Sequence, residues 1–170
     1  MNEKVKWPRG MRNNNPLNIR RNSKSKWVGE VDKLSYSKND TMVCDTVYSD
    51  RVFCQFSELK YGWRAAFILL KRYINVLGCN TVETIIKRWA PENENNTKGY
   101  INRVAFDMNI GVDEPILFAN RLAMYQLASA MCRVENGYAF DPANEATWIN
   151  AMANGYTLAE QCGRYDKPKL

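Results

Sequence analysis

The chain has no histidine among its 170 residues. This absence excludes Ser-His-Asp and Cys-His nucleophile systems, and it excludes the histidine-containing zinc sites that many peptidases and amidases use. Any catalysis must therefore rest on carboxylates, with Tyr, Lys or Arg as helpers. Cleavage of a glycosidic bond by carboxylates needs no other group, so we expect no metal and no cofactor.

Long apolar runs are also missing. The longest, such as AAFILL, are too short to span a bilayer, and the opening MNEKVKWPRG lacks the apolar core of a secretion signal. We therefore expect a protein made in a cytoplasm, without a membrane span. The five cysteines form no C-x-x-C pair, which favours reduced thiols, with a Cys44–Cys54 bridge across a hairpin as the alternative.

The residues that are present have the composition of an ordinary globular domain, with 45% hydrophobic and 25% charged residues. Basic residues number 24 against 18 acidic ones, which gives a formal charge of +6. That excess favours a polyanionic partner, whether nucleic acid, anionic lipid or the acidic bacterial cell wall. The sign of the charge does not choose among these three.

Two regions are visible within one expected domain, 1–170. Residues 7–57 are rich in Asn, Ser, Asp and Lys, and the stretch DTVYSDRVFCQF alternates in a way that favours short antiparallel strands. Residues 58–162 have helical periodicity. The predicted fold class is therefore α+β and mostly α, with a small N-terminal β-hairpin region followed by about five helices.

Local signals place the ends of several helices. Five stretches have apolar residues at helical spacing: 58–78, 81–90, 95–111, 113–137 and 141–155. Gly78 is a good C-terminal stop for the first, and Thr81 is a good N-cap for the second. The residues that we assign to the core from this spacing are Trp63, Phe67, Leu70 and Leu122.

The most unusual stretch is RGMRNNNPLNIR, which runs from Arg9 to Arg20. Asn resists helices and Pro16 disfavours a helical Asn15, so the stretch is an ordered turn or a recognition loop. Side-chain amides such as those of Asn15 and Asn18 match sugar hydroxyls and N-acetyl groups, and Arg20 matches carboxylates on a glycan. The alternative is turn hydrogen bonding for the asparagines and a solvated basic face for the arginines.

Four segments in order resemble a group of bacteriophage proteins of the lysozyme-like superfamily: RGMRNNNPLNIR, KWVGE, FCQFSELKYGWRAAFILLKRYI and TVETIIKRWAPENENNTKGYINRV. They are also similar to cell-wall glucosaminidases and lytic transglycosylases, which have an Asn-x-x-x-Ile loop, a Trp-x-Gly strand and an Asn/Asp-x-x-Tyr segment along a sugar cleft. The resemblance and the loop chemistry together imply these substrate-binding residues: Asn15, Asn18, Ile19, Arg20, Trp27 and Tyr100.

This sequence departs from the family pattern at the position of the catalytic acid. In those enzymes the catalytic Glu ends a helix that precedes the Asn loop, whereas here only Glu3 precedes the loop. The later stretch LASAMCRVENGYA places Glu135 near the end of a helix of the same character. This order implies a circularly permuted lysozyme-like fold, with Glu135 on the floor of a groove beside Asn18, Trp27 and Tyr100.

A general acid for glycoside cleavage must stay protonated near neutral pH, so it needs an apolar seat that raises its pKa above the roughly 4.3 of free glutamate. Met131 and Val134 supply such a seat for Glu135, and the alternative is a solvated residue at a helix end. Glu58 is the second catalytic candidate, although an acid in a first helical turn is common for capping reasons. Candidates for a second carboxylate are Glu30, Asp45 and Asp50.

Three functions follow from these patterns. The first is a phage peptidoglycan-degrading enzyme of muramidase or lytic transglycosylase type, made in the host cytoplasm and acting at the cell wall on glycan strands, with other virion proteins as partners. The second is a catalytically inactive virion structural protein that has kept a lysozyme-like fold. A basic nucleic-acid-binding domain is the least favoured, because the chain has no zinc motif, RNA-binding signature or clear basic helix.

Overall fold

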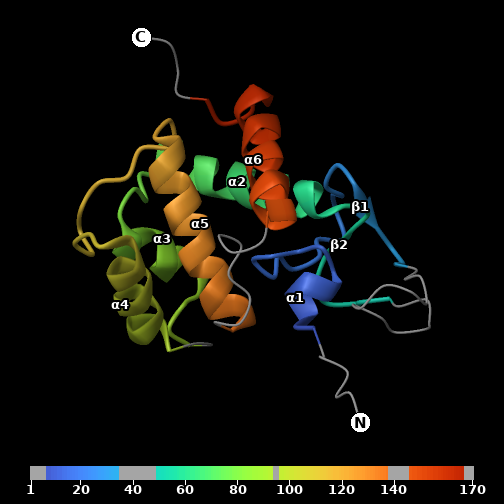
Figure 1. Ribbon diagram of the computed structural model, residues 1–170, viewed down its shortest axis with the longest axis horizontal. Coiled ribbons are helices and arrows are strands. Elements are labelled where there is room, and N and C mark those ends of the chain that lie inside the picture. The colour runs from blue at the N-terminus through green and yellow to red at the C-terminus, as the bar shows by residue number, and fades with distance from the viewer. Residues whose placement is uncertain (1–6, 35–48, 94–95, 138–145, 167–170) are drawn as a thin grey trace.

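The computed structural model describes residues 7–34, 49–93, 96–137 and 146–166. Six helices and two short strands occur in these ranges, and their arrangement is shown in Figure 1. This content of helices and strands confirms the predicted fold class, α+β and mostly α. The elements are α1 (Arg9–Arg12), β1 (Glu30–Val31), β2 (Gln55–Phe56), α2 (Leu59–Asn75), α3 (Val82–Trp89), α4 (Thr97–Met108), α5 (Arg121–Asn136) and α6 (Ala146–Gln161).

The largest packing interface joins α2 to α6, which cross in Figure 1. The predicted apolar stripe of α2 is confirmed, since Trp63, Phe67 and Leu70 are all buried. Tyr156 of α6 meets Phe67 edge-on with ring centroids 5.2 Å apart, a geometry that aromatic pairs prefer. The close crossing requires Gly155, because a Cβ at that position would meet the Trp63 side chain and backbone atoms of α2.

Helices α3, α4 and α5 pack in series, with α4 against both of the others. Each begins at a side-chain cap, which satisfies backbone donors that a helix start leaves free. Thr81 caps α3 as predicted, through a reciprocal pair of hydrogen bonds with Thr84. Asn96 and Asn120 accept from backbone amides in the first turns of α4 and α5.

The N-terminal region is held mainly by hydrogen bonds of irregular backbone. The two strands form a short antiparallel sheet in which Glu30 lies opposite Phe56. The rest of the pairing is made by the loop after α1, where Cys54 N donates to Ile19 O over 2.9 Å and Phe56 N donates to Asn13 O over 2.9 Å. The loop therefore runs beside residues 53–56 and shares a ladder with them that is too irregular to count as sheet.

Strand β2 pairs antiparallel with β1, which gives the expected small N-terminal β region. Cys54 is a buried free thiol, as the sequence favoured, and burial raises its pKa to about 12. Cys44 lies outside the described residues. One expectation for the helices is wrong. Helix α5 begins only at Arg121, because Asn120 caps it, so Leu122 falls in the first turn and is 68% exposed instead of buried. Helix α1 was not expected from the sequence.

Replacing Gly155 with Ala should destabilise the protein by about 1–3 kcal/mol, because the added methyl group overpacks the crossing of α2 and α6. Helix propensity alone predicts the opposite, a gain of up to about 1 kcal/mol. Asn154→Ala, at the exposed neighbouring position of α6, is the matched control for propensity. Urea unfolding of both variants measures the difference, and equal stabilities would contradict the close crossing.

Candidate active site

A groove of about 320 Å³ opens between the N-terminal region and the helical region. One wall is the loop after α1 together with the segment that leads to β1, and the other wall comes from α2 and α3. The lining combines amides, one guanidinium and aromatic rings. The lining residues are Asn18, Ile19, Arg20, Asn22, Ser25, Trp27, Leu69, Tyr73 and Trp89.

Glu135 joins this groove through hydrogen bonds to its carboxyl group. Asn18 Nδ2 donates to Oε2 over 3.0 Å, and the hydroxyl of Tyr100 donates to Oε1 over 3.0 Å. Trp89 is near enough to the carboxyl to act on its pKa, in the direction that favours the charged form. Asn18 and Trp89 both line the groove, so the acid lies behind its wall.

Burial raises the pKa of Glu135 above its ordinary value, and the hydrogen bonds that its carboxyl accepts offset only part of that rise. The physical cause is the loss of water around the charged form, which favours the neutral acid. Tyr100 is itself buried, and burial together with the adjacent Glu135 raises its pKa well above the ordinary value. Glu135 therefore lies in a buried site that favours its protonated form. Of the two residues expected to seat it, Met131 is buried and Val134 is partly buried.

The asparagines of the loop divide into buried and groove-lining residues. Asn15 is fully buried, and its side chain donates to Ile19 O and Cys54 O and accepts from Ile19 N. The prediction that Asn15 binds substrate is therefore wrong, because its amide is buried and already makes its hydrogen bonds to backbone groups of the protein. Asn13 is fully buried as well and donates to Asp50. Only Asn18 of this set reaches the groove.

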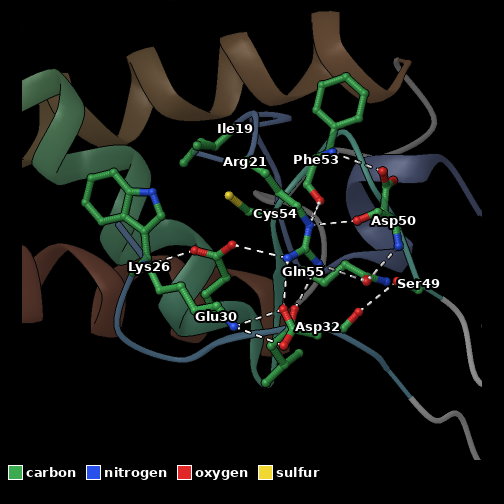
Figure 2. Close-up of polar contacts among 12 residues, drawn as sticks. Ile19, Arg21, Lys26, Glu30, Asp32, Ser49, Asp50, Phe53, Cys54 and Gln55 are labelled. Atoms are coloured by element: carbon green, nitrogen blue, oxygen red, sulfur yellow. Dashed lines mark hydrogen bonds and ion pairs between the residues drawn. The ribbon is translucent and has the colours of Figure 1, made fainter. Parts of the chain in front are cut away.

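A polar cluster beneath the loop accounts for two of the three candidate second carboxylates (Figure 2). At its centre the guanidinium of Arg21 donates to the carbonyls of Val31, Asp50 and Phe53. The same guanidinium lies 3.5 Å from Glu30, whose side chain is only 2% exposed and accepts from Trp27 N. Glu30 is thus a structural ion-pair partner.

Asp50 is equally committed. Arg9 donates twice to its carboxylate, over 2.6 and 2.8 Å, and Asn13 donates a third hydrogen bond. Burial alone would raise the pKa of Asp50, but these donors and the backbone amide of Phe53 hold it well below its usual range. Asp45 lies outside the described residues. Within the described ranges, no Asp or Glu lines the groove itself.

The other predicted site residues fall into two groups. Asn18, Ile19, Arg20 and Trp27 line the groove as predicted. Tyr100 does not line it, since it is 8% exposed and contacts the acid instead of an open surface. Glu58 is exposed beside α2 and pairs with Lys60, outside both the groove lining and the contacts of Glu135.

Sequence reasoning missed the aromatic pair on the far wall. Tyr73 and Trp89 meet edge-on with centroids 6.2 Å apart. Trp89 lies in the sequence Arg-Trp-Ala-Pro, within one of the four segments that resemble the phage proteins, and this could have marked it as a site residue. Nothing in the sequence distinguishes Tyr73 from the other apolar residues of α2. Among the described residues, no group of three or more His, Cys, Asp or Glu side chains is placed to hold a metal ion.

None of the described helices is long and apolar enough to cross a membrane. No protein-family model matches the chain. A bacteriophage protein does match it: Protein P5 of Pseudoalteromonas phage PM2 is 36% identical over 138 residues, which cover 78% of this chain and 76% of the relative. The chain belongs to the Protein P5 family. This relative is a phage protein, and the match covers more than three quarters of each of the two chains.

The raised pKa of Glu135 predicts how stability depends on pH in this member of the Protein P5 family. The folded protein holds the proton more tightly than the unfolded chain, so this contribution to stability is complete below the unfolded pKa and is lost as pH rises through the folded pKa. Glu135→Gln cannot ionise and escapes that loss. The variant should therefore gain stability relative to wild type as pH increases above 4.5.

Urea unfolding at a series of pH values measures this difference between the two proteins. Glu58→Gln, at an exposed position, reports what loss of a surface carboxylate does by itself. A constant difference between wild type and Glu135→Gln across the series would mean that the Glu135 carboxyl is not held in a site that disfavours its charge.

Proposed function

We propose that the protein cleaves the glycan strand of peptidoglycan, with a lysozyme-like fold and with Glu135 as the general acid. The observation that carries the proposal is a carboxyl group whose pKa is raised by burial, bonded to residues that line a groove. Tuned carboxyl groups of this kind are typical of acids that protonate a leaving oxygen. The absence of histidine from the chain fits a carboxylate mechanism.

The groove chemistry supports a sugar as the substrate. Trp27, Tyr73 and Trp89 present aromatic surface, on which the apolar faces of sugar rings can pack. Asn18 and Asn22 add amide groups that can exchange hydrogen bonds with hydroxyl or N-acetyl groups. A substrate that is both hydroxylated and ring-shaped uses both kinds of lining at once.

Charge at the groove fits the same substrate. Arg20 is exposed there, and its guanidinium lies over the ring of Phe53, which keeps it near the opening. Guanidinium groups bind carboxylates in a planar two-point geometry, and peptidoglycan carries carboxylates on its lactyl and peptide parts. The net charge of +6 adds a longer-range attraction to an acidic cell wall.

In the proposed reaction, Glu135 gives its proton to the glycosidic oxygen as the bond to the sugar breaks, and the sugar carbon gains positive character. A hydrolase then needs a base to activate water, and no second acid lines the groove among the described residues. A lytic transglycosylase avoids that need, because a hydroxyl of the sugar itself attacks the carbon. The proton of that hydroxyl passes to the Glu135 carboxylate that the first step leaves, so a single acid completes the cycle. A groove with one acid therefore favours the transglycosylase form of the reaction over the muramidase form.

The proposal extends to where the protein works. Kinship with a phage protein fits a role at the host cell wall, either from the virion at entry or at release, with virion proteins as neighbours. The alternative is an inactive structural protein of the virion, which would keep the groove but would release no fragments from sacculi.

Glu135→Gln should lower the rate of glycan cleavage by about two to four orders of magnitude, because the amide keeps the size of the side chain but has no acidic proton to donate. Turbidity loss of purified sacculi and chromatography of released fragments measure the rate. Glu58→Gln is the matched control and should retain most activity, since Glu58 pairs with Lys60 away from the acid. A fully active Glu135→Gln variant would refute the assignment.

The products should identify the bond and the reaction. We expect muropeptides with anhydro ends and no new free amino groups, because the chain lacks the histidines on which most amidases and zinc peptidases depend. Mass spectrometry of the fragments distinguishes anhydro ends from the reducing ends of hydrolysis. Reducing ends would correct the reaction type alone, whereas free amino groups would contradict cleavage of the glycan.

A further inference from the structure

Two buried side-chain oxygens beside Glu135 accept no hydrogen bond from any residue that the structure describes: Asn18 Oδ1 and Asn136 Oδ1. Asn136 is only 8% exposed, so water does not readily replace the missing donor. Both oxygens lie close to the same point, the position that a Cβ of Gly10 in α1 would take. A Cβ on Gly10 would collide with Asn136 Oδ1 and would lie 2.7 Å from Asn18 Oδ1.

Buried polar atoms in folded proteins almost always have partners, so two unpaired acceptors that converge on one point require an explanation. The backbone oxygen of Asn15 lies at the same point, 2.8 Å from the position of that Cβ. It already accepts from Asn18 N over 3.0 Å and has a second lone pair. Three acceptors thus lie around this point, and two of them have no donor among the described residues.

The Asn18 amide is the group that can supply the donor. In the structure its Nδ2 donates to Glu135 Oε2 over 3.0 Å, with a longer contact of 3.4 Å to Glu135 O. That orientation suits an ionised carboxylate, which only accepts hydrogen bonds. A neutral Glu135 must also donate, and an amide nitrogen cannot accept its proton.

We propose that the Asn18 amide rotates when Glu135 takes up its proton, so that Asn18 Oδ1 accepts the hydrogen bond of the neutral acid and Asn18 Nδ2 donates to Asn136 Oδ1. The rotation gives both unpaired oxygens a partner in one step. Asn18 is then the positioning residue that orients the proton of the acid, and Asn136 acts through Asn18. This inference rests on the proposed function only in treating Glu135 as the acid of the reaction.

The surroundings restrict the movement to Asn18. Asn136 Nδ2 donates to Pro16 O over 2.7 Å and to Cys132 O over 3.1 Å, so the Asn136 amide cannot turn without losing both bonds. Its Oδ1 is therefore fixed toward Gly10. The backbone of Asn18 is held in the left-handed region, with φ of 52°, and rotation about the side chain alone is enough to exchange its oxygen and nitrogen.

The groups that face Glu135 leave few other partners for the proton. Tyr100 on α4 can reverse its hydroxyl, whereas the indole of Trp89 on α3 only donates. Cys132 on α5 is the other titratable neighbour in this cluster, through its contact with Asn136. No charged side chain of the described residues contributes to the pKa of Glu135, and the nearest cation of the groove wall is Arg20, which follows Asn18 by two positions.

The rotation would serve both halves of the proposed reaction. Before cleavage, the carbonyl of Asn18 holds the proton on Glu135. After the proton has passed to the glycosidic oxygen, the electron pair of the O–H bond stays on the carboxylate, and the Asn18 NH2 group turns back to donate to it. One side chain would then stabilise the acid and its conjugate base in turn.

A pH titration of the wild-type protein by NMR tests the rotation without substrate. With Glu135 ionised, the nuclear Overhauser contact between the Asn18 Nδ2 protons and the Gly10 α-protons should be weak. Below the pKa of Glu135, followed through its carboxyl carbon, that contact should become several-fold stronger. A contact of constant strength across the titration would overturn the proposal.

Two variants at Asn136 test the same coupling through the acid dissociation constant of Glu135. Asn136→Leu removes the acceptor of the rotated amide and should make Glu135 roughly three- to tenfold more acidic. Asn136→Gln keeps an amide oxygen without adding a charge and should leave the acidity of Glu135 closer to that of wild type. Both variants disturb the bond to Pro16, so a role of Asn136 as a mere tether predicts similar shifts in the two variants, which would refute the proposal. The carboxyl carbon of Glu58 serves as the internal control in each spectrum.

These outcomes are separate from those of the proposed function. A contact that switches with pH in a protein that leaves sacculi intact would support the rotation and refute the enzyme. Cleavage of sacculi by a protein without the switch would do the reverse. Neither result depends on the stability of a single variant, because the first measurement uses the wild-type chain.

Discussion

The candidate site depends on three hydrogen bonds made by the side chain of Asn15. This amide donates to and accepts from the backbone of Ile19, which closes the loop, and it also donates to Cys54 O. One buried side chain thus joins two backbone segments, as hydrogen bonds between strands do in a regular sheet. A buried amide that loses such partners is costly, which makes this arrangement close to all-or-none. The position of Asn18, and through it the hydrogen bond to Glu135, follows from that closure.

Helix α2 supports the same loop from the other side. A Cβ on Gly62 would collide with Asn14 O, so the helix approaches the loop backbone directly. Asn14 also donates from its side chain to Phe56 O over 2.9 Å. The loop is thus confined between β2 and α2, and α2 in turn is fixed by its crossing with α6. Rigid support of this kind is what a site needs to hold an acid and its partners within hydrogen-bond distance.

How well the sequence predicted each part depended on how far apart the interacting residues lie. The ends of α2 and α3 were predictable because Gly78 and Thr81 act on their own neighbours. The meeting of Glu135 with Asn18 and Tyr100 was also predicted, but from a resemblance, since no local pattern links residues 117 positions apart.

The failures have the same origin. Leu122 has the spacing of a core residue, but the cap at Asn120 starts α5 late and turns that position toward water. The role of Arg21 could not be predicted, because it bonds carbonyls that only the folded chain brings together. Asn15 was misassigned because the sequence shows an amide without showing that its partners are other parts of the same loop.

The separation between Asn18 and Glu135 also has a consequence for the order in which the molecule is made. A chain that grows from its N-terminus makes the loop, β2, α2 and α3 before α5 exists, and Asn18 precedes Glu135 by 117 residues of synthesis. The crossing of α2 with α6 comes later still. Closing such long loops is slow compared with forming single helices. The nascent chain therefore contains every residue that lines the groove before it contains the carboxyl group behind it.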